Sequence, residues 1–185
     1  MMQVILIPEK PSYLSPATRA TQAAMKTPNT LEPTTLHELD SEQIREILRN
    51  HYVGSLAFIS HRHPYVLPIT YYYDEPANCL ISYSMEGQKI EAMRKNPAVS
   101  LGVYEMESPM QWKSVLVHGR FEELHQIDAK AYLHRFTEGI RKKIDPKGSR
   151  AHTCIEDFSS RAHTLGIPLV YRIKIADWTG MYRKG

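Results

Sequence analysis

The sequence predicts a mainly β, α+β fold, a small antiparallel barrel of about six strands with attached helices. Three observations support this prediction. Short runs rich in β-branched and aromatic residues recur along the chain, turn-forming residues separate them, and no alternation of strands and helices indicates a parallel sheet. The chain has 185 residues, of which 42% are hydrophobic and 23% charged, as expected for one globular domain.

The first structured element is predicted to follow a long irregular segment. Residues 1–35 contain five prolines among many Ser, Thr and Ala residues, so we expect an extension outside the core. The domain is then expected to span residues 36–185. A helix is predicted from Asp40 to Asn50, because Asp40 can cap it and Gln43 completes a capping box. An apolar stripe at helical spacing follows, formed by Ile44, Ile47 and Leu48.

Six strands and two further helices are predicted after this helix. The strands cover residues 54–59, 65–73, 79–84, 98–104, 112–124 and 168–176, and the helices cover residues 87–97 and 128–142. The polar stretch 144–161 is expected to be a loop with some helical turn. Pro68 cannot donate to a strand ladder, so it indicates a sheet edge, a bulge or a backbone that faces something other than a strand. Gly119 is expected at a bulge or bend of its strand.

Composition excludes several classes of protein. The net charge is +3, and basic residues are dispersed except for Arg141–Lys143, so no nucleic-acid partner is expected. No apolar run is long enough for a membrane helix, and no signal peptide is recognisable, so we expect a cytoplasmic protein without a membrane partner. The two cysteines, Cys79 and Cys154, lie far apart, which indicates neither a disulfide framework nor a zinc ribbon.

The segment Tyr83–Lys89 has the features of a phosphate-binding turn. A strand is predicted to end there and a helix to begin, and the unpaired N–H groups of a helix N-terminus attract phosphate. Ser84 offers a hydroxyl, Gly87 permits close backbone approach, and Lys89 adds a positive charge. The alternative is an ordinary solvated lysine in the first turn of a surface helix.

Four motifs follow one another along the chain. They are G-x-L-A-F at Gly54–Phe58, V-x-P-I-T-Y at Val66–Tyr71, S-x-E-G-x-K-x-x-x-x-R-x-N-P at Ser84–Pro97, and W-x-S-V-x-x-x-G at Trp112–Gly119. With these motifs the sequence resembles the pyridoxamine 5′-phosphate oxidase-like proteins, particularly the Nim-type branch similar to nitroimidazole-resistance proteins. The resemblance implies a six-stranded antiparallel split barrel with Greek-key character and flanking helices. It also implies a homodimer that holds FMN between its subunits.

The resemblance also implies a role for individual residues. The flavin ring would be lined by Leu67, Pro68, Ile69, Thr70 and Tyr71. Tyr83 and Ser84 would contact the ribityl and phosphate region, Gln88 and Lys89 would hold the phosphate, and Trp112 and Ser114 would reach the flavin from the other subunit. Many Nim-like relatives carry a histidine where Tyr83 stands, so an activity that needs that imidazole is in doubt here.

The expected function is that of an FMN-dependent oxidoreductase. It would take hydride or electrons from a reduced nicotinamide and pass them to a small acceptor, with nitroaromatic compounds among the candidates. No catalytic side chain is assigned, and water or a tyrosine such as Tyr71 could supply a proton. Two alternatives remain open, a flavin- or haem-binding protein without turnover and a reductase that uses the deazaflavin F420.

Other chemistries have less support in the sequence. His61 and His63 form a close pair in a proline turn, without the Cys, Asp or Glu pattern of a metal site, so no metal is expected. No G-x-S-x-G motif indicates a serine hydrolase. Oxidation of pyridoxamine phosphate itself is disfavoured, because no arginine–histidine signature for the substrate phosphate occurs near residues 177–183.

Overall fold

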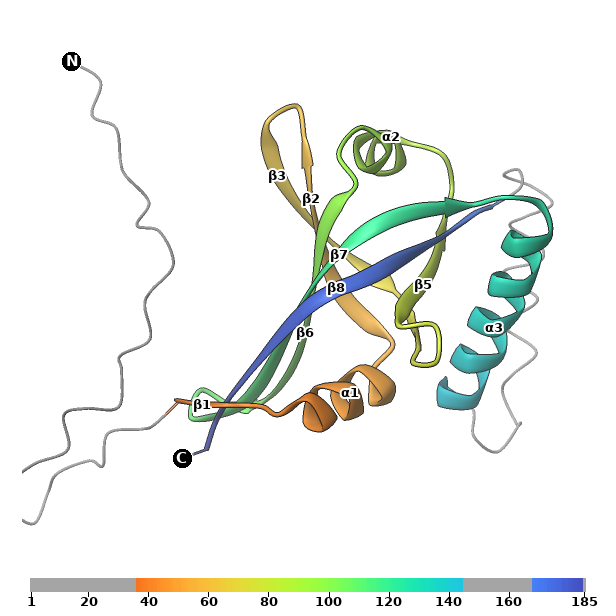
Figure 1. The fold of residues 1–185 in the computed structure, drawn as a ribbon. Coiled ribbons are helices and arrows are strands. Elements are labelled where there is room, and N and C mark those ends of the chain that lie inside the picture. The colour runs from red at the N-terminus through yellow and green to blue at the C-terminus, as the bar shows by residue number, and fades with distance from the viewer. Residues whose placement is uncertain (1–35, 145–167, 185) are drawn as a thin grey trace, which may run out of the picture. The chain divides into compact units, whose positions relative to one another are not determined.

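The computed structural model describes residues 36–144 and 168–184 (Figure 1). The expected extension at residues 1–35 and residues 145–161 of the expected loop lie outside the described residues, whereas Ile144, predicted as the start of that loop, is helical. The elements are β1 (Leu36–Glu38), α1 (Ser41–Asn50), β2 (Val53–Ser60), β3 (His63–Thr70), β4 (Tyr72–Asp74), β5 (Cys79–Ser84), α2 (Gln88–Lys95), β6 (Ala98–Ser108), β7 (Gln111–Leu124), α3 (Gln126–Ile144) and β8 (Leu169–Arg183).

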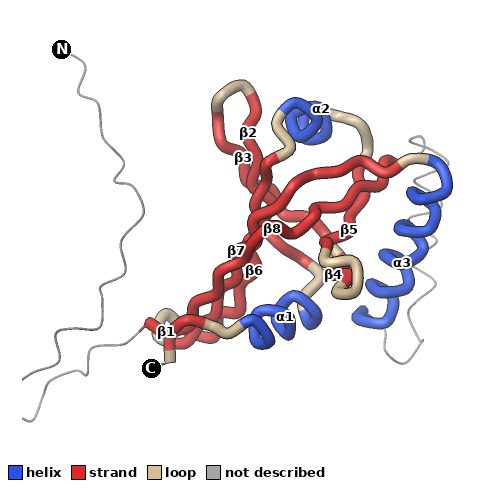
Figure 2. The backbone as a smooth tube through the Cα atoms, viewed as in Figure 1, coloured by secondary structure: helices blue, strands red, loops and turns tan. Residues whose placement is uncertain are grey.

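All the strands in the described part of the chain belong to one antiparallel sheet, so the predicted mainly β, α+β class is confirmed (Figure 2). The strand order is β3-β2-β6-β7-β8-β5-β4, with β1 added on β8. Neighbours that are not consecutive in the chain, β2 with β6 and β5 with β8, give the sheet its Greek-key character.

The prediction of six strands was wrong, because the described residues alone form a sheet of eight. The predicted strand 65–73 is interrupted at Tyr71, whose N–H donates to the carbonyl of Tyr52 at 2.8 Å instead of continuing a ladder. This separates β3 from β4. The other additional strand, β1, consists of three exposed residues that pair with Met181–Arg183 of β8. Because β1 has no buried face, its sequence lacks the alternation of apolar and polar residues that would predict a strand.

Helix α1 forms as its sequence predicts. The Asp40 carboxylate accepts from the N–H groups of Glu42 and Gln43 at 2.9 Å each, and the Gln43 side chain accepts from the Asp40 N–H at 2.9 Å. This capping box satisfies amides that have no partner inside the helix. The buried side chains Ile44, Ile47 and Leu48 attach the helix to the core.

The core lies on the inner face of the curved sheet. Buried residues from β2, β3, β5, β6, β7 and β8 form one hydrophobic cluster with α1 and α2, so the sheet wraps around a shared interior. A second cluster packs α3 through Phe136 and Ile140 against Cys79, Ile81 and Val170. Among the described helices, none is both long and apolar enough to cross a membrane.

Two special positions behave as expected. Pro68 lies on β3 and pairs with Ser55 of β2. Strand β3 is at one edge of the sheet order. The pairing of β7 with β8 shifts between His118 and Gly119, which confirms the bulge or bend. A Cβ on Gly119 would lie 2.6 Å from the Lys174 carbonyl oxygen, so the close approach of β8 requires glycine there.

Candidate functional site

The turn before α2 forms as the motif predicts. Strand β5 ends at Ser84, and α2 begins at Gln88 after the exposed residues 85–87. Gly87 adopts φ 158° and ψ −176°, and a Cβ there would meet no atom within 4 Å, so its backbone conformation rather than space favours glycine. The buried side chains of Ile90, Ala92 and Met93 hold the helix on the core, which fixes its first turn.

Lys89, in this first turn, is half-buried instead of extended into solvent. Its Nζ lies 6.0 Å from the centre of the Tyr171 ring. No carboxylate of the described residues lies within ion-pair distance of it, and burial lowers the pKa of its ammonium group. A partly desolvated cation without a counter-ion attracts an anion, and the helix N-terminus beside it has the same preference.

The turn between β2 and β3 adjoins this lysine. The Gln88 side-chain amide donates to the Ser60 hydroxyl at 3.5 Å, and that hydroxyl lies 3.1 Å from Nδ1 of His61. Ser60 is buried although it is polar. Sequence reasoning missed Ser60 and its neighbour His61, because the contact of Ser60 with Gln88 spans 28 residues. Ser84 and Gln88, the two other predicted phosphate contacts, flank the turn between β5 and α2.

The residues of β3 and its end divide between two environments. Leu67, Pro68 and Thr70 are exposed and remain accessible to a ligand, whereas Ile69 is buried. Tyr71 is fully buried, and its phenol donates to the Leu48 carbonyl at 3.3 Å. Burial raises the pKa of Tyr71 well above its usual range, so its proton is bound firmly inside the core.

Tyr83 faces a different part of the molecule. Its ring makes an edge contact with Phe136 of α3 at 5.2 Å and joins the second hydrophobic cluster. Successive side chains of a strand alternate between faces, so Ser84 points to the opposite side. The Ser84 hydroxyl donates to the carbonyl of Met85 at 3.0 Å. The structure therefore does not bring the rings of Tyr83 and Tyr71 to the side of Lys89.

Trp112 and Ser114, both half-buried, lie near the opposite end of β7 from the lysine. Tyr171, beneath Lys89, pairs with Glu123. The strand from Trp112 to Glu123 is about 36 Å long at the usual rise per residue. In Figure 1, α2 lies at one end of the sheet and the β6–β7 turn at the other. Within one chain, Trp112 and Lys89 do not share a site.

Trp112 instead lines a pocket of about 420 Å³ beside the β6–β7 turn. Lys113, Glu105 and Arg183 line the same pocket. The Lys113 ammonium pairs with the Glu105 carboxylate at 3.0 Å, so this positive charge already has a partner.

The outer face of the sheet, opposite the core, carries exposed apolar residues on β2, β3, β6 and β7. Paired positions form a continuous row across these strands, consisting of Pro68, Ser55, Gly102 and Leu116. Val66 is 63% exposed and Tyr104 is 59% exposed on the same face. Ser114 pairs with Tyr104 there. The outer face thus joins three of the predicted flavin residues, Pro68, Thr70 and Ser114.

A larger hollow of about 700 Å³ lies between α3 and β4. Three of the cations around it, Arg49, Arg135 and Lys143, are already engaged. Arg49 pairs with Glu42 and Glu75, and Arg135 pairs with the buried Asp74 carboxylate at 2.9 Å. Lys143 donates to the His51 carbonyl at 2.7 Å. The remaining lysine there, Lys142, is exposed, whereas Lys89 is half-buried beside a helix N-terminus, so Lys89 is the better candidate for anion binding. No group of three or more His, Cys, Asp or Glu side chains in the described residues could hold a metal ion.

Comparison with known proteins agrees with this curved antiparallel sheet. The sequence profile of the pyridoxamine 5′-phosphate oxidase family matches residues 40–181. The chain therefore belongs to this family, and the predicted split-barrel fold and the resemblance drawn from the four motifs are confirmed.

Solved structures of similar fold include flavoproteins. An FAD-binding protein of Mesorhizobium loti is 28% identical, with a TM-score of 0.63 over 82% of this chain and 99% of that chain. A candidate 5-nitroimidazole antibiotic resistance protein of Bacteroides thetaiotaomicron is 15% identical, with a TM-score of 0.61 over 88% and 96% of the two chains. An FAD- and haem-binding protein of Mycobacterium smegmatis is 15% identical, with a TM-score of 0.58 over 79% and 72%. The last two show the fold alone.

A curated relative matches a shorter segment. An uncharacterised protein of Rhizobium meliloti (strain 1021) is 54% identical over 61 residues, which are 33% of this chain and 39% of that protein. The match thus spans well under half of the relative's length.

Proposed function

We propose that this protein binds FMN at the interface of a homodimer and acts as an oxidoreductase. The observation that carries the proposal is Lys89, a half-buried cation without a counter-ion among the described residues, at the N-terminus of α2. A phosphate monoester supplies the missing negative charge and acceptor oxygens for the free N–H groups of the helix. Family membership and the FAD-binding neighbour at 28% identity support a flavin as the molecule that carries this phosphate.

In this proposal the chain supplies two parts of the site. Lys89, Gln88 and Ser84 hold the phosphate, while Tyr83 contributes through its backbone because its ring packs on α3. The backbone and exposed side chains of residues 67–70 meet the flavin ring, and Tyr71 supports them from within the core. FMN fits a single phosphate site, so we prefer it to FAD, F420 and haem.

The partner subunit completes the site. Trp112 lies about 36 Å along β7 from the strand position beside Lys89, so one chain cannot bring both to one flavin. The exposed apolar residues of the outer face are of the kind that a homodimer buries. We propose that two outer faces pack together and that the partner subunit's Trp112 and the partner subunit's Ser114 reach the flavin.

A bound flavin supplies the redox chemistry by accepting a hydride or electrons and passing them on. The residues of this chain position the ring, neutralise the phosphate and exclude water at the interface. A reduced nicotinamide is the proposed donor, and a small molecule such as a nitroaromatic compound is the proposed acceptor. We propose that the reaction takes place in the cytoplasm.

A second candidate is a flavin- or haem-binding protein without turnover. It is favoured by the enclosure of Tyr71, the side chain that could otherwise supply a proton, in a hydrogen bond to Leu48 inside the core.

An absorbance experiment separates the two candidates. The purified protein is loaded with FMN, and NADH or NADPH is added without oxygen. Bleaching of the flavin band, followed by its return when a nitroaromatic compound is added, is expected for the oxidoreductase. A flavin band that neither nicotinamide changes would favour the binding protein.

A further inference from the structure

Arg94 connects two parts of the chain that flank the candidate phosphate site. Its guanidinium donates to the Glu86 carboxylate from Nη1 at 2.5 Å and from Nη2 at 3.0 Å. It also donates to the Glu123 carboxylate from Nε at 2.6 Å and from Nη2 at 2.9 Å. One side chain of α2 thus binds two carboxylates in bidentate fashion, a geometry that the planar guanidinium favours.

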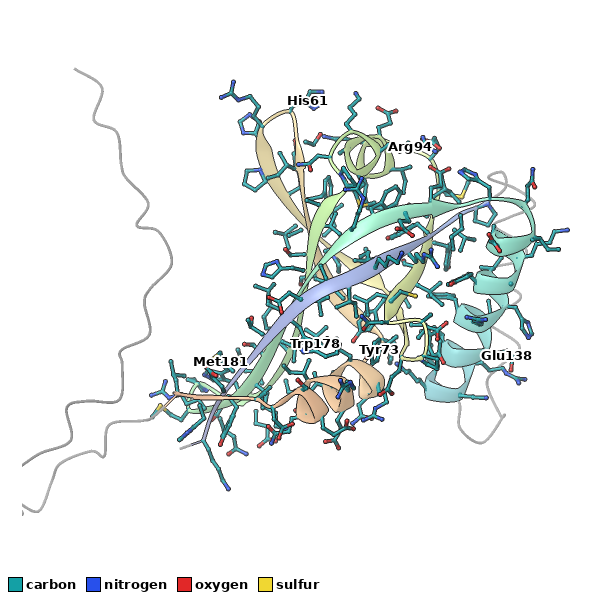
Figure 3. All side chains as sticks on the ribbon, viewed as in Figure 1. His61, Tyr73, Arg94, Glu138, Trp178 and Met181 are labelled. Atoms are coloured by element: carbon teal, nitrogen blue, oxygen red, sulfur yellow. The ribbon has the colours of Figure 1, made fainter. Side chains whose placement is uncertain are left out.

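The two carboxylates belong to the surroundings of Lys89. Glu86 stands in the turn between Ser84 and Gln88, three positions before the lysine. Glu123 pairs with Tyr171, whose ring lies beneath the lysine ammonium group. Arg94 therefore ties the turn to the strand pair that supports Lys89, and Figure 3 shows it beside α2, at the same end of the domain as His61.

This arrangement matters because Glu86 could otherwise compete for the lysine. A free carboxylate three residues before Lys89 would pair with its ammonium group or repel an incoming phosphate. With Glu86 bound to Arg94, the Lys89 ammonium has no anionic partner among the described residues.

We propose that Arg94 is a positioning residue that holds the Glu86 carboxylate away from Lys89 and so keeps the lysine available for a phosphate. The inference rests on the proposed function, since it concerns the same phosphate. It also explains the co-occurrence of glutamate, lysine and arginine in the motif at Ser84–Pro97, where glutamate and arginine form one ion pair and leave the lysine without one.

The test compares FMN with riboflavin, which has the same ring but lacks the phosphate. In Arg94→Gln the Kd for FMN should rise about fivefold, because Glu86 is released toward Lys89, whereas the Kd for riboflavin should stay within about twofold. The double variant Glu86→Gln, Arg94→Gln removes the competing carboxylate and should recover most of the lost FMN affinity. Glu86→Gln alone should bind FMN at least as tightly as the wild type.

Three results would overturn the inference. Arg94→Gln could bind FMN like the wild type, it could lose riboflavin and FMN affinity equally, or the double variant could bind FMN no better than Arg94→Gln. Thermal melting of each variant checks the fold.

A second measurement keeps the inference separate from the proposed function. Hydrogen exchange of the amides of residues 85–89 in the flavin-free protein should be faster in Arg94→Gln than in the wild type, because the turn loses its tie to β7. Unchanged exchange would contradict the role of Arg94 in positioning this turn. If the wild type binds no flavin but exchange is faster in the variant, the proposed function is refuted, while the positioning of the turn by Arg94 is supported.

Discussion

The Lys89 ammonium group lies 6.0 Å from the centre of the Tyr171 ring. Tyr171 is fully buried, and burial raises its pKa to about 12, so its phenol is uncharged at physiological pH. A cation over an aromatic face is modestly stabilised, and more so when it is partly desolvated. This contact holds the lysine in place but leaves its charge uncompensated, which is the basis of the proposed anion site.

Removal of the Lys89 charge should weaken FMN selectively. Loss of a charge-assisted hydrogen bond to phosphate predicts a rise in Kd of about 10- to 100-fold for Lys89→Met. Riboflavin affinity should remain nearly constant, and fluorescence titration measures both constants. Lys95→Met is the matched control, since Lys95 is an exposed lysine of the same helix, and it should bind FMN like the wild type. Equal FMN affinity in the two lysine variants would exclude Lys89 from the site.

FMN affinity should depend on the protonation of the same lysine. Burial lowers the pKa of Lys89 in the free protein below its ordinary value of 10.5. Phosphate binds the protonated form, so the Kd for FMN should increase as pH rises through that lowered pKa. Riboflavin titrations correct for ionisation of the ring itself. An identical pH profile in Lys89→Met would show that another group is responsible.

The outer face should mediate dimerisation. Leu116 lies in the row of paired residues that includes Pro68, and it is partly exposed in the single chain. A charge at its position would be buried in the proposed interface, so Leu116→Arg should give a monomer that binds flavin weakly. Light scattering after size-exclusion chromatography measures the mass.

Ile127 offers the control for this variant, because it is 80% exposed on α3, outside the outer face. Ile127→Arg should keep the wild-type mass and flavin affinity. A dimeric Leu116→Arg protein with a normal melting temperature would place the subunit interface elsewhere.

Lys143 should make stability depend on alkaline pH. Its Nζ donates to the His51 carbonyl and lies over the rings of Tyr71 and Tyr72, and burial lowers its pKa to about 8. Between this value and the ordinary 10.5, the unfolded chain binds more protons than the folded chain. The free energy of unfolding of the wild type, relative to Lys143→Met, should therefore increase with pH across this window, by about 1 kcal/mol.

Urea titrations of both proteins at several pH values measure this difference. Subtracting the free energy of unfolding of the variant from that of the wild type removes the contributions of Tyr71 and the other groups that titrate in the same range. A constant difference between the two proteins would show that Lys143 is solvated in the folded state.

Elements set by local signals could be predicted from the sequence. The capping box of Asp40 and Gln43 depends on residues three apart, and strand Cys79–Ser84 combines apolar residues with flanking turns. Elements set by distant partners could not. Strand β8 continues beyond Ala176 to Arg183 because β7 pairs with it, although Asp177 and Thr179 interrupt the apolar pattern.

The candidate site shows the same division. The motif around Lys89 is local and therefore visible in the sequence. The tie from Arg94 to Glu123 spans 29 residues, and the contact of Gln88 with Ser60 spans 28, so both depend on the tertiary fold. The burial of Tyr71 was also hidden, because three successive tyrosines alternate between faces and the sequence does not indicate which face is the core.

A titration of the purified protein with FMN, followed by quenching of flavin fluorescence, tests the central claim most directly. The account predicts saturable binding that ends when FMN and protein chains are equimolar, and much weaker binding of riboflavin. A protein that leaves FMN fluorescence unchanged at every concentration, or that binds riboflavin as tightly as FMN, would contradict a phosphate held by Lys89.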